Sequence, residues 1–158
     1  YYLKLIKNYK IRSIEDPFHE DNGFAWADLL HDTRLMNKHY SDYTQIVGDD
    51  RFATNSKRLI FQGFAEETAN AILIKPNQAG TVSETLSVIE IAKGEKYETI
   101  ISHRSGDSED TFIADLAVGT GSSQIKTGSL ARSERVAKYN RLLRIEEELG
   151  NSAKMANI

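Results

Sequence analysis

The chain has 158 residues, with 20 lysines and arginines against 23 aspartates and glutamates, a formal net charge of -3 and 40% hydrophobic residues. This composition excludes a disordered or collagen-like chain, and no apolar run approaches the roughly 18 residues that a membrane-spanning helix needs. The near-neutral charge gives no bulk reason to expect a nucleic acid or an anionic membrane as partner, and the absence of cysteine fits a reducing cytoplasm.

Short apolar runs alternate with longer stretches of helical period, which is the pattern of a sheet of parallel strands covered by helices. Residues 1–9 are predicted to be the end of a helix. In chain order the pattern then predicts strand 11–14, helix 26–38, strand 45–48, helix 56–67, strand 71–74, helix 82–93, strand 99–102, helix 111–118, strand 124–126 and helix 134–149. The strands should be buried on both faces, as parallel strands are.

The length indicates how many such units the chain holds. A complete eight-fold β/α barrel has roughly 250 residues, or about 31 per unit, so this chain has room for about five. An open doubly wound sheet is the alternative, but it carries a glycine-rich phosphate turn after its first strand, where this chain has EDPF at 15–18. We therefore predict an α/β fold, a partial TIM-type β/α barrel with parallel strands, over residues 1–150, followed by a polar tail at 151–158.

Charged side chains follow every predicted strand. The first two strands end in carboxylates and the last three in cations, namely Glu15-Asp16, Asp49-Asp50, Lys75, His103-Arg104 and Lys126. Because parallel strands point their carboxyl ends the same way, we expect these side chains to converge at one mouth. A buried carboxylate without a partner is costly, so Glu15 and Asp49 are predicted metal ligands, and carboxylates suit Mg²⁺. Turn capping is the better explanation for Asp16 and Asp50.

The cations favour an acidic substrate. Lys75 ends an apolar strand, where burial and neighbouring positive charge would lower its pKa toward that of a general base, although it could equally serve only to neutralise the carboxylates. Residues 103–106 offer a guanidinium, a hydroxyl and a flexible backbone suited to a phosphate, the alternative being an exposed basic turn. Lys126 could stabilise negative charge growing on a carboxylate. The run 141–148 is interpreted as a solvated helix face with i, i+4 pairing.

Six segments, in this order, closely resemble the enolase family over nearly the whole chain. They are SIEDPF at 13–18, VGDD at 47–50, IKPNQAGT at 74–81, SHRSGD at 102–107, QIKTG at 124–128, and the stretch from RSER at 132–135 to RIEEELG at 144–150. Several long motifs in a fixed order are far more specific than any single motif. The resemblance implies the C-terminal part of the barrel of a phosphopyruvate hydratase, a lyase of glycolysis that reversibly dehydrates 2-phosphoglycerate to phosphoenolpyruvate.

The resemblance also implies roles at the reacting end of the substrate. Lys75 would remove the proton next to the substrate carboxylate, as the general base. Glu15 and Asp49 would be two of three carboxylate ligands of the Mg²⁺ that stabilises the aci-carboxylate intermediate.

The remaining implied roles concern substrate binding. Arg104 and Ser105 would hold the phosphate, and His103 would lie in the substrate pocket. Lys126 would contact the carboxylate side of the substrate and contribute to catalysis.

The same resemblance implies parts that are not found in residues 1–158: a cap domain, the early strands with the third metal ligand, the glutamate of proton donation and the loops that close over substrate. We therefore expect a C-terminal piece of an enolase, two of its strands lying at unpaired edges. Full-length members are homodimers or higher homo-oligomers of the cytoplasm, also found at the cell surface. The alternatives are a non-catalytic, enolase-derived binding protein and another superfamily enzyme acting on a carboxylic acid.

Overall fold

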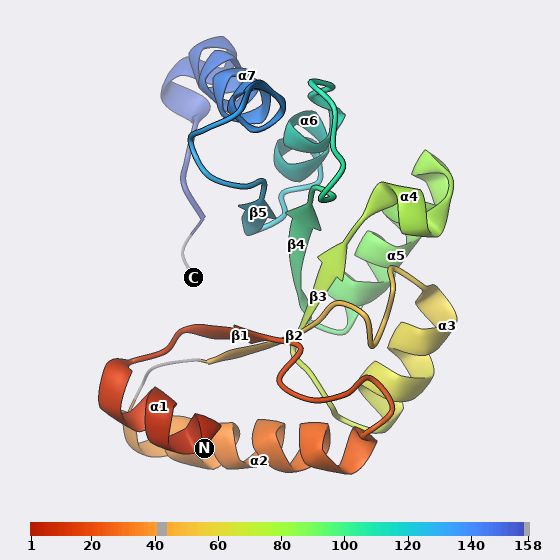
Figure 1. The fold of residues 1–158 in the computed structure, drawn as a ribbon, viewed down its shortest axis with the longest axis vertical. Helices are drawn as coiled ribbons and strands as arrows, with labels where there is room; N and C mark the ends of the chain where they lie inside the picture. Colours follow the sequence, from red (N-terminus) through yellow and green to blue (C-terminus); the bar gives the residue numbers. More distant parts are fainter. Residues whose placement is uncertain (41–43, 157–158) are drawn as a thin grey trace. The chain divides into compact units, whose positions relative to one another are not determined.

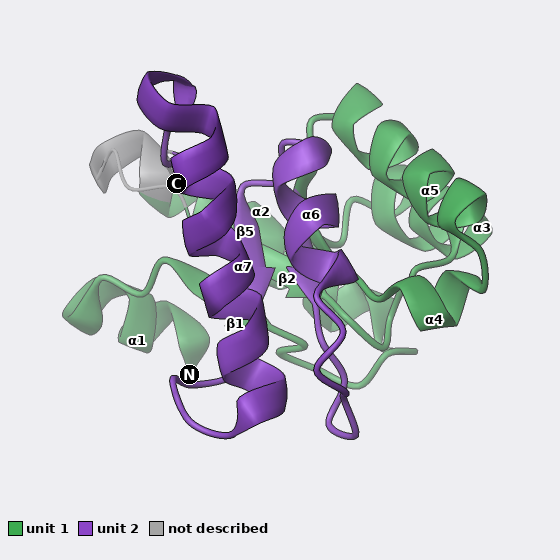
Figure 2. Cartoon of the chain, turned by 90° about the horizontal axis from the view of Figure 1, so that it is seen from above, with its two compact units in different colours: residues 1–98 green, residues 99–158 purple. Residues whose placement is uncertain are grey.

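The computed structural model describes residues 1–40 and 44–156 (Figure 1). These form two compact units, residues 1–98 and residues 99–158 (Figure 2). Among the described residues, no helix combines the length and the apolar character needed to cross a bilayer. The predicted tail begins in a short 3-10 helix, η2 (Gly150–Ser152), and its last two residues lie outside the described part. The domain boundary at residue 150 stays a prediction.

The first unit alternates helices and strands. Its elements are α1 (Tyr2–Tyr9), β1 (Ser13–Glu15), α2 (Gly23–Tyr40), β2 (Gln45–Gly48), α3 (Ser56–Arg58), η1 (Leu59–Ala65), β3 (Ala71–Ile74), α4 (Pro76–Ala79) and α5 (Val82–Gly94). Strand β2 pairs in parallel with β1 on one side and with β3 on the other. The apolar core of this unit includes Trp26, Leu30, Ile46, Phe52, Leu59, Ile72 and Ile74.

The second unit is smaller. It is built from β4 (Glu98–Ser102, whose first residue belongs to the first unit), α6 (Phe112–Gly119), β5 (Gln124–Lys126) and α7 (Ser133–Leu149). Strands β4 and β5 are parallel, and α6 packs against α7 (Figure 1). The α/β class with parallel strands separated by helices is thus confirmed.

The predicted helix at 56–67 is only partly right. One helical turn, α3, is capped by the Asn55 side chain, which accepts from the backbone N–H groups of Lys57 and Arg58. The following seven residues form the π-helix η1, and the backbone N–H of Thr68 reaches back five residues to the carbonyl of Gly63. Such wide turns are rare, and apolar periodicity carries no signal for them.

Burial of the strands differs from the expectation. Strands β2 and β3 are buried throughout, as predicted. In β1, by contrast, Ser13 and Glu15 are exposed, and β5 is only partly buried. The prediction that the strands near 11–14 and 124–126 are buried on both faces is therefore wrong, because these short strands carry polar residues that stay exposed, Ser13 and Glu15 in β1 and Lys126 in β5.

One glycine explains how the end of β2 packs. A Cβ built at Gly48 would lie 2.3 Å from Cε2 of the fully buried Phe52. We expect Gly48→Ala to lower the free energy of unfolding by about 1–3 kcal/mol, as overpacking of a core does. Urea unfolding of the variant measures this. Gly94→Ala is the matched control, since a Cβ built at Gly94 would have no neighbouring atom within 4 Å, and equal losses for both variants would contradict the packing argument.

Candidate active site

Three predicted site residues lie on one face of the sheet in the first unit. Glu15 pairs with Val47, and Val47 pairs with Ala71. Because alternate residues of a strand point to the same face, Asp49, two residues after Val47, shares the face of Glu15. Lys75, four residues after Ala71, shares it too. The register of the strands therefore gathers these three side chains at the carboxyl ends of β1, β2 and β3.

Lys75 and Asp49 form a buried ion pair. The Lys75 Nζ donates to both carboxylate oxygens of Asp49, at 2.7 and 2.6 Å. The two side chains are only 13% and 11% exposed, and charges this buried need a close partner. Thr54 adds support, since its hydroxyl accepts from the backbone N–H of Lys75 at 2.9 Å. Lys75 thus neutralises a carboxylate, one of the two roles left open by the sequence, and its role as a base stays a prediction.

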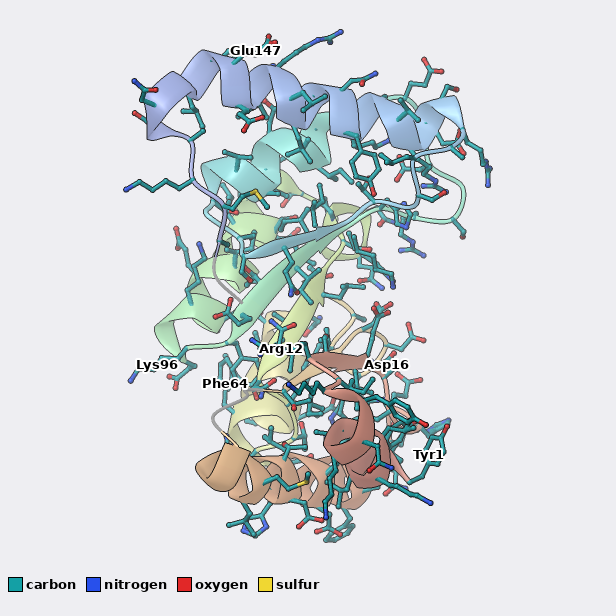
Figure 3. All side chains as sticks on the ribbon, turned by 90° about the vertical axis from the view of Figure 1, so that its left-hand side faces the viewer. Tyr1, Arg12, Asp16, Phe64, Lys96 and Glu147 are labelled. Carbon is teal, nitrogen blue, oxygen red and sulfur yellow. The ribbon has the colours of Figure 1, made fainter. Side chains whose placement is uncertain are left out.

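Asp16 fixes the loop that carries Asp49. Labelled in Figure 3, it directly follows β1, and its carboxylate accepts from the backbone N–H groups of Asp49 and Asp50 at 2.9 and 3.0 Å. Asp16 itself adopts a left-handed backbone conformation, with φ 43°. The prediction that Asp16 caps its own turn is therefore wrong, because its carboxylate caps the loop after the neighbouring strand. Burial, together with the charges of Asp49 and Asp50, raises the pKa of Asp16.

The acidic end of this face could hold a divalent cation. Asp16, Asp49 and Asp50 each offer a carboxylate oxygen within 4.8 Å of the others, and hard oxygen ligands suit Mg²⁺ or Ca²⁺. Glu15 is not one of these three, and its exposure contradicts the premise that it is a buried carboxylate. Its role as a metal ligand stays a prediction, as does that of Asp49. The structure adds Asp16 and Asp50, which the sequence assigned to capping alone.

The second unit holds the other predicted site residues. Strand β5 ends at Lys126, and the backbone N–H of His103 donates to the carbonyl of Lys126 at 2.9 Å, which extends the β4–β5 ladder by one bond. His103 is partly buried, whereas Arg104 and Ser105 are exposed. These four residues therefore lie around the carboxyl ends of β4 and β5, in agreement with their predicted placement at the ends of strands.

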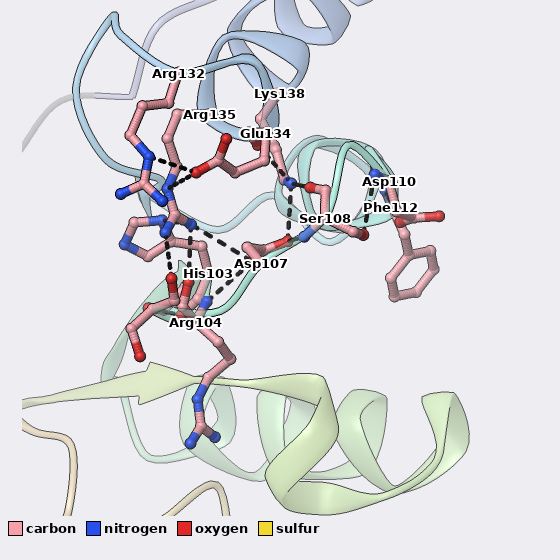
Figure 4. A network of polar contacts seen from close by, with 12 residues as sticks. His103, Arg104, Asp107, Ser108, Asp110, Phe112, Arg132, Glu134, Arg135 and Lys138 are labelled. Atoms are coloured by element: carbon pink, nitrogen blue, oxygen red, sulfur yellow. Dashed lines mark hydrogen bonds and ion pairs between the residues drawn. The ribbon is translucent and has the colours of Figure 1, made fainter.

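Arg135 of α7 holds the start of the loop 103–108, which we call the HRS loop (Figure 4). Arg135 is buried, with 6% of its surface exposed. Its guanidinium donates to Nδ1 of His103 and to the carbonyls of Arg104 and Ser105, each at 2.8 Å. One side chain thus fastens three consecutive residues.

Lys138 holds the other end of the HRS loop. It is 1% exposed, and its Nζ donates to a carboxylate oxygen of Asp107 at 2.9 Å, to the carbonyl of Glu134 at 2.8 Å and to the carbonyl of Ser108. Asp107 also accepts from the backbone N–H groups of Arg104 and Ser108. Burial alone would raise the pKa of Asp107, but these amide donors and Lys138 outweigh it and hold that pKa below its usual value.

These supporting residues of α7 were missed by sequence reasoning. The only sign of them in the sequence was the RSER motif at 132–135. That motif is one of the segments that carry the family resemblance, but no role was assigned to its residues. The prediction for 141–148 is also wrong in detail. Arg141 pairs with Asp115 of α6 at 2.6 Å and with Glu148, seven residues on, at 2.9 Å, so it links two helices rather than making an i, i+4 pair.

The geometry of each unit defines a class of protein: an α/β protein of parallel strands and helices whose charged residues at strand ends are candidates for catalysis. The whole chain, residues 1–158, matches the family model described as enolase, C-terminal TIM barrel domain. An enolase from Pelagibacter ubique (strain HTCC1062) is 63% identical over 157 residues, and one from Mycobacterium leprae (strain TN) is 53% identical over 156. The chain belongs to the enolase family, which confirms the resemblance and the barrel class.

The alignments cover 99% of this chain but only 35% and 34% of these two relatives. The chain therefore spans about a third of the length of the curated relatives that it matches. Membership of the family implies a divalent metal cofactor in general terms, and the three clustered carboxylates of the first unit fit such an ion. That the acids of the first unit and the cations of the second meet at one mouth stays a prediction.

The lowered pKa of Asp107 predicts a pH dependence of stability. An aspartate whose pKa is depressed on folding stabilises the fold above its unfolded value of about 3.9, and this contribution is lost as the pH falls through the folded pKa. We expect Asp107→Asn to lower the free energy of unfolding at pH 7 and to make little difference at pH 2. Urea unfolding at both values tests this. Glu147→Gln, an exposed change on α7, is the control, and a pH-independent loss for Asp107→Asn would contradict the ionic explanation.

Proposed function

We propose that this chain provides the C-terminal barrel residues of an enolase that reversibly dehydrates 2-phosphoglycerate to phosphoenolpyruvate in glycolysis. The observation that carries the proposal is the buried pair of Lys75 and Asp49, which places a lysine amine beside a candidate metal ligand at the strand ends of an enolase-family chain. The base acts on the carbon next to the substrate carboxylate and the metal acts on that carboxylate, so the proposal requires the two to lie close together.

Lys75 acts as the general base in this proposal. Once deprotonated, its amine takes the proton from the carbon between the phosphate ester and the carboxylate, so that the C–H electron pair moves toward the carboxylate. The neighbouring carbon then loses its hydroxyl, which leaves as water with a proton from an acid outside these 158 residues, and a carbon–carbon double bond forms. A base in hydrogen-bond reach contributes roughly 10²–10⁴-fold to such a step.

Mg²⁺ is the proposed metal, held by Asp49 together with Glu15, with Asp16 and Asp50 close by. When bound, such an ion stabilises negative charge on a substrate carboxylate. Asp16 accepts hydrogen bonds from the backbone amides of Asp49 and Asp50, so it keeps the ligand loop in place. The proposal that Asp49 is a ligand is supported by its placement beside two further carboxylates.

The cations of the second unit bind the substrate anion in this proposal. Arg104 and Ser105 supply a guanidinium and a hydroxyl for the phosphate, with His103 beside them. Lys126 offers positive charge to the substrate carboxylate. The fastening of the HRS loop by Arg135 supports a binding role over an exposed basic turn, since a merely solvated turn needs no buried cation beneath it.

The surrounding assignments follow from the same proposal. The partner is a small molecule, with no nucleic acid or membrane, in a cytoplasmic homo-oligomer. A non-catalytic binding protein would not need Lys75 paired with Asp49, and a superfamily enzyme acting on a non-phosphorylated acid would not need the donors of the HRS loop. The pairing and the loop therefore favour the enolase reaction over both alternatives.

Activity is tested best in a chimera in which residues 1–158 replace the matching segment of the Pelagibacter ubique relative. We expect the chimera to convert 2-phosphoglycerate, followed by the absorbance of the enol product. Lys75→Ala should lower kcat by at least about 10²-fold, whereas Lys57→Ala, an exposed change on α3, should leave it unchanged. Turnover retained by Lys75→Ala would refute the role of the base. The 158-residue chain alone is expected to be inactive.

Metal binding has a readout that needs no substrate. A ligand that binds only the folded state raises the melting temperature with its concentration, so Mg²⁺ should stabilise the chimera after treatment with EDTA. The segment supplied by the relative can also bind Mg²⁺, so the absolute affinity of the chimera is not the measure. The measure is how much Mg²⁺ affinity Asp49→Asn loses. Asp21→Asn, at a side chain that is 82% exposed, is the control and should lose none. An unchanged Mg²⁺ dependence in Asp49→Asn would exclude Asp49 as a ligand.

A further inference from the structure

We propose that Arg135 is a positioning residue, which fixes His103 in its neutral form with the proton on Nε2 and holds the backbone of Arg104 and Ser105. The inference deepens the proposed function, because it specifies the state in which the HRS loop meets an anionic substrate. It rests on the contacts that one buried guanidinium makes within the second unit (Figure 4).

The hydrogen-bond chemistry of the two groups decides the tautomer. An arginine guanidinium has donors only and no acceptor. Its contact with Nδ1 of His103, at 2.8 Å, therefore requires Nδ1 to accept, so the proton of the neutral ring is on Nε2. In a protonated ring Nδ1 would also be a donor, and two N–H groups would face each other. Arg135 thus selects one of the three possible states of His103.

The charges around His103 act in the same direction. Arg135, Lys126 and Lys138 are positive and oppose protonation of the ring, while Asp107 is the negative group that favours it. Burial, followed by the charge of Arg135, lowers the pKa of His103. The ring is therefore neutral at physiological pH, and the proton on Nε2 is a stable feature of the loop.

The packing beneath Arg135 shows that its position is built into the fold. A Cβ placed on Gly128 would lie 2.9 and 3.0 Å from Cδ and Cγ of Arg135, and 3.2 Å from Cε1 of His103. Gly128 also has φ +81°, a conformation that side chains rarely adopt. The glycine that follows Lys126-Thr127 thus leaves the space in which the guanidinium reaches the imidazole.

This arrangement leaves His103 with one defined donor. Nδ1 and Nε2 flank Cε1 and point outward from the ring in different directions, so the N–H on Nε2 is directed away from Arg135 and can donate to an oxygen of an anionic substrate. A ring free to change tautomer would present an acceptor there about as readily, and a lone pair repels phosphate or carboxylate oxygens. Arg135 therefore acts on the substrate through His103, without touching it.

A chimera with ¹³C-labelled histidine allows the tautomer and the titration of His103 to be read from the NMR shifts of its ring carbons. The His103 signal is assigned as the one that disappears in His103→Asn. The wild-type segment should show the Nε2–H form at neutral pH. In Arg135→Gln the ring should shift toward a mixture of tautomers and titrate at higher pH, because an opposing charge is gone. Arg144→Gln, an exposed change on the same helix, should alter neither signal.

Kinetics with 2-phosphoglycerate give the second readout. Partners that orient a functional histidine typically contribute about 10–100-fold, so kcat/KM of Arg135→Gln should fall in that range. Arg135→Lys retains a donor and a charge for Nδ1 and should keep the Nε2–H form with a smaller loss, which also serves if Arg135→Gln does not fold. An unchanged tautomer and titration in Arg135→Gln, or a mixture of tautomers in Arg135→Lys, would overturn the proposal. The NMR outcome needs no turnover, so it is distinguishable from a failure of the enolase reaction itself.

Discussion

The burial of charged side chains is the constraint on which both units depend. An ion removed from water is costly unless it is paired and hydrogen bonded, and this chain buries Asp49, Arg51, Arg135 and Lys138. Arg51 illustrates how completely the cost is met: its guanidinium reaches the Thr68 hydroxyl, a Glu66 carboxylate oxygen and two backbone carbonyls, and lies 5.4 Å from the ring centre of Trp26. Each buried charge therefore ties several segments of chain together, and the loops at the strand ends are ordered by this requirement.

Local pattern was sufficient to predict most of the strands and helices. The segments 45–48, 71–74 and 124–126 are strands at the predicted residues; the first two contain β-branched or aliphatic runs, and the third has a single isoleucine, Ile125, between polar residues. The prediction of which faces of these elements are buried was less accurate. Trp26, Leu29, Leu30 and Thr33 form the buried stripe of α2, whereas Leu35 is 45% exposed, because it lies five residues from Leu30 and so on another side of the helix.

Long-range partners explain what could not be predicted. Asp16 reaches backbone groups 33 and 34 residues away, and Arg135 reaches His103 across 32 residues. An arginine in a polar helix is normally solvated, so α7 gave no local sign that two of its cations are buried. The candidate site residues could be named from the sequence, because charge at the end of an apolar strand is conspicuous, and their roles stay predictions. The residues that hold them in place are ordinary in sequence and become distinctive only through the fold.

The two units support their loops with charges of opposite sign, a partly buried carboxylate in the first and a buried guanidinium in the second, and this difference sets the direction of the backbone dipoles. In the first unit the Asp16 carboxylate binds the N–H groups of Asp49 and Asp50. In the second, Arg135 binds the carbonyls of Arg104 and Ser105. The described chain has no cis peptide bond, and in a trans peptide the N–H points opposite to the preceding C=O. The N–H groups that follow these two carbonyls therefore point away from Arg135, and such successive amides attract anions. A cation that binds carbonyls from behind thus leaves N–H groups on the other side of the HRS loop, the polarity that the proposed phosphate site requires, whereas the Asp16 carboxylate engages N–H groups beside the proposed metal ligands.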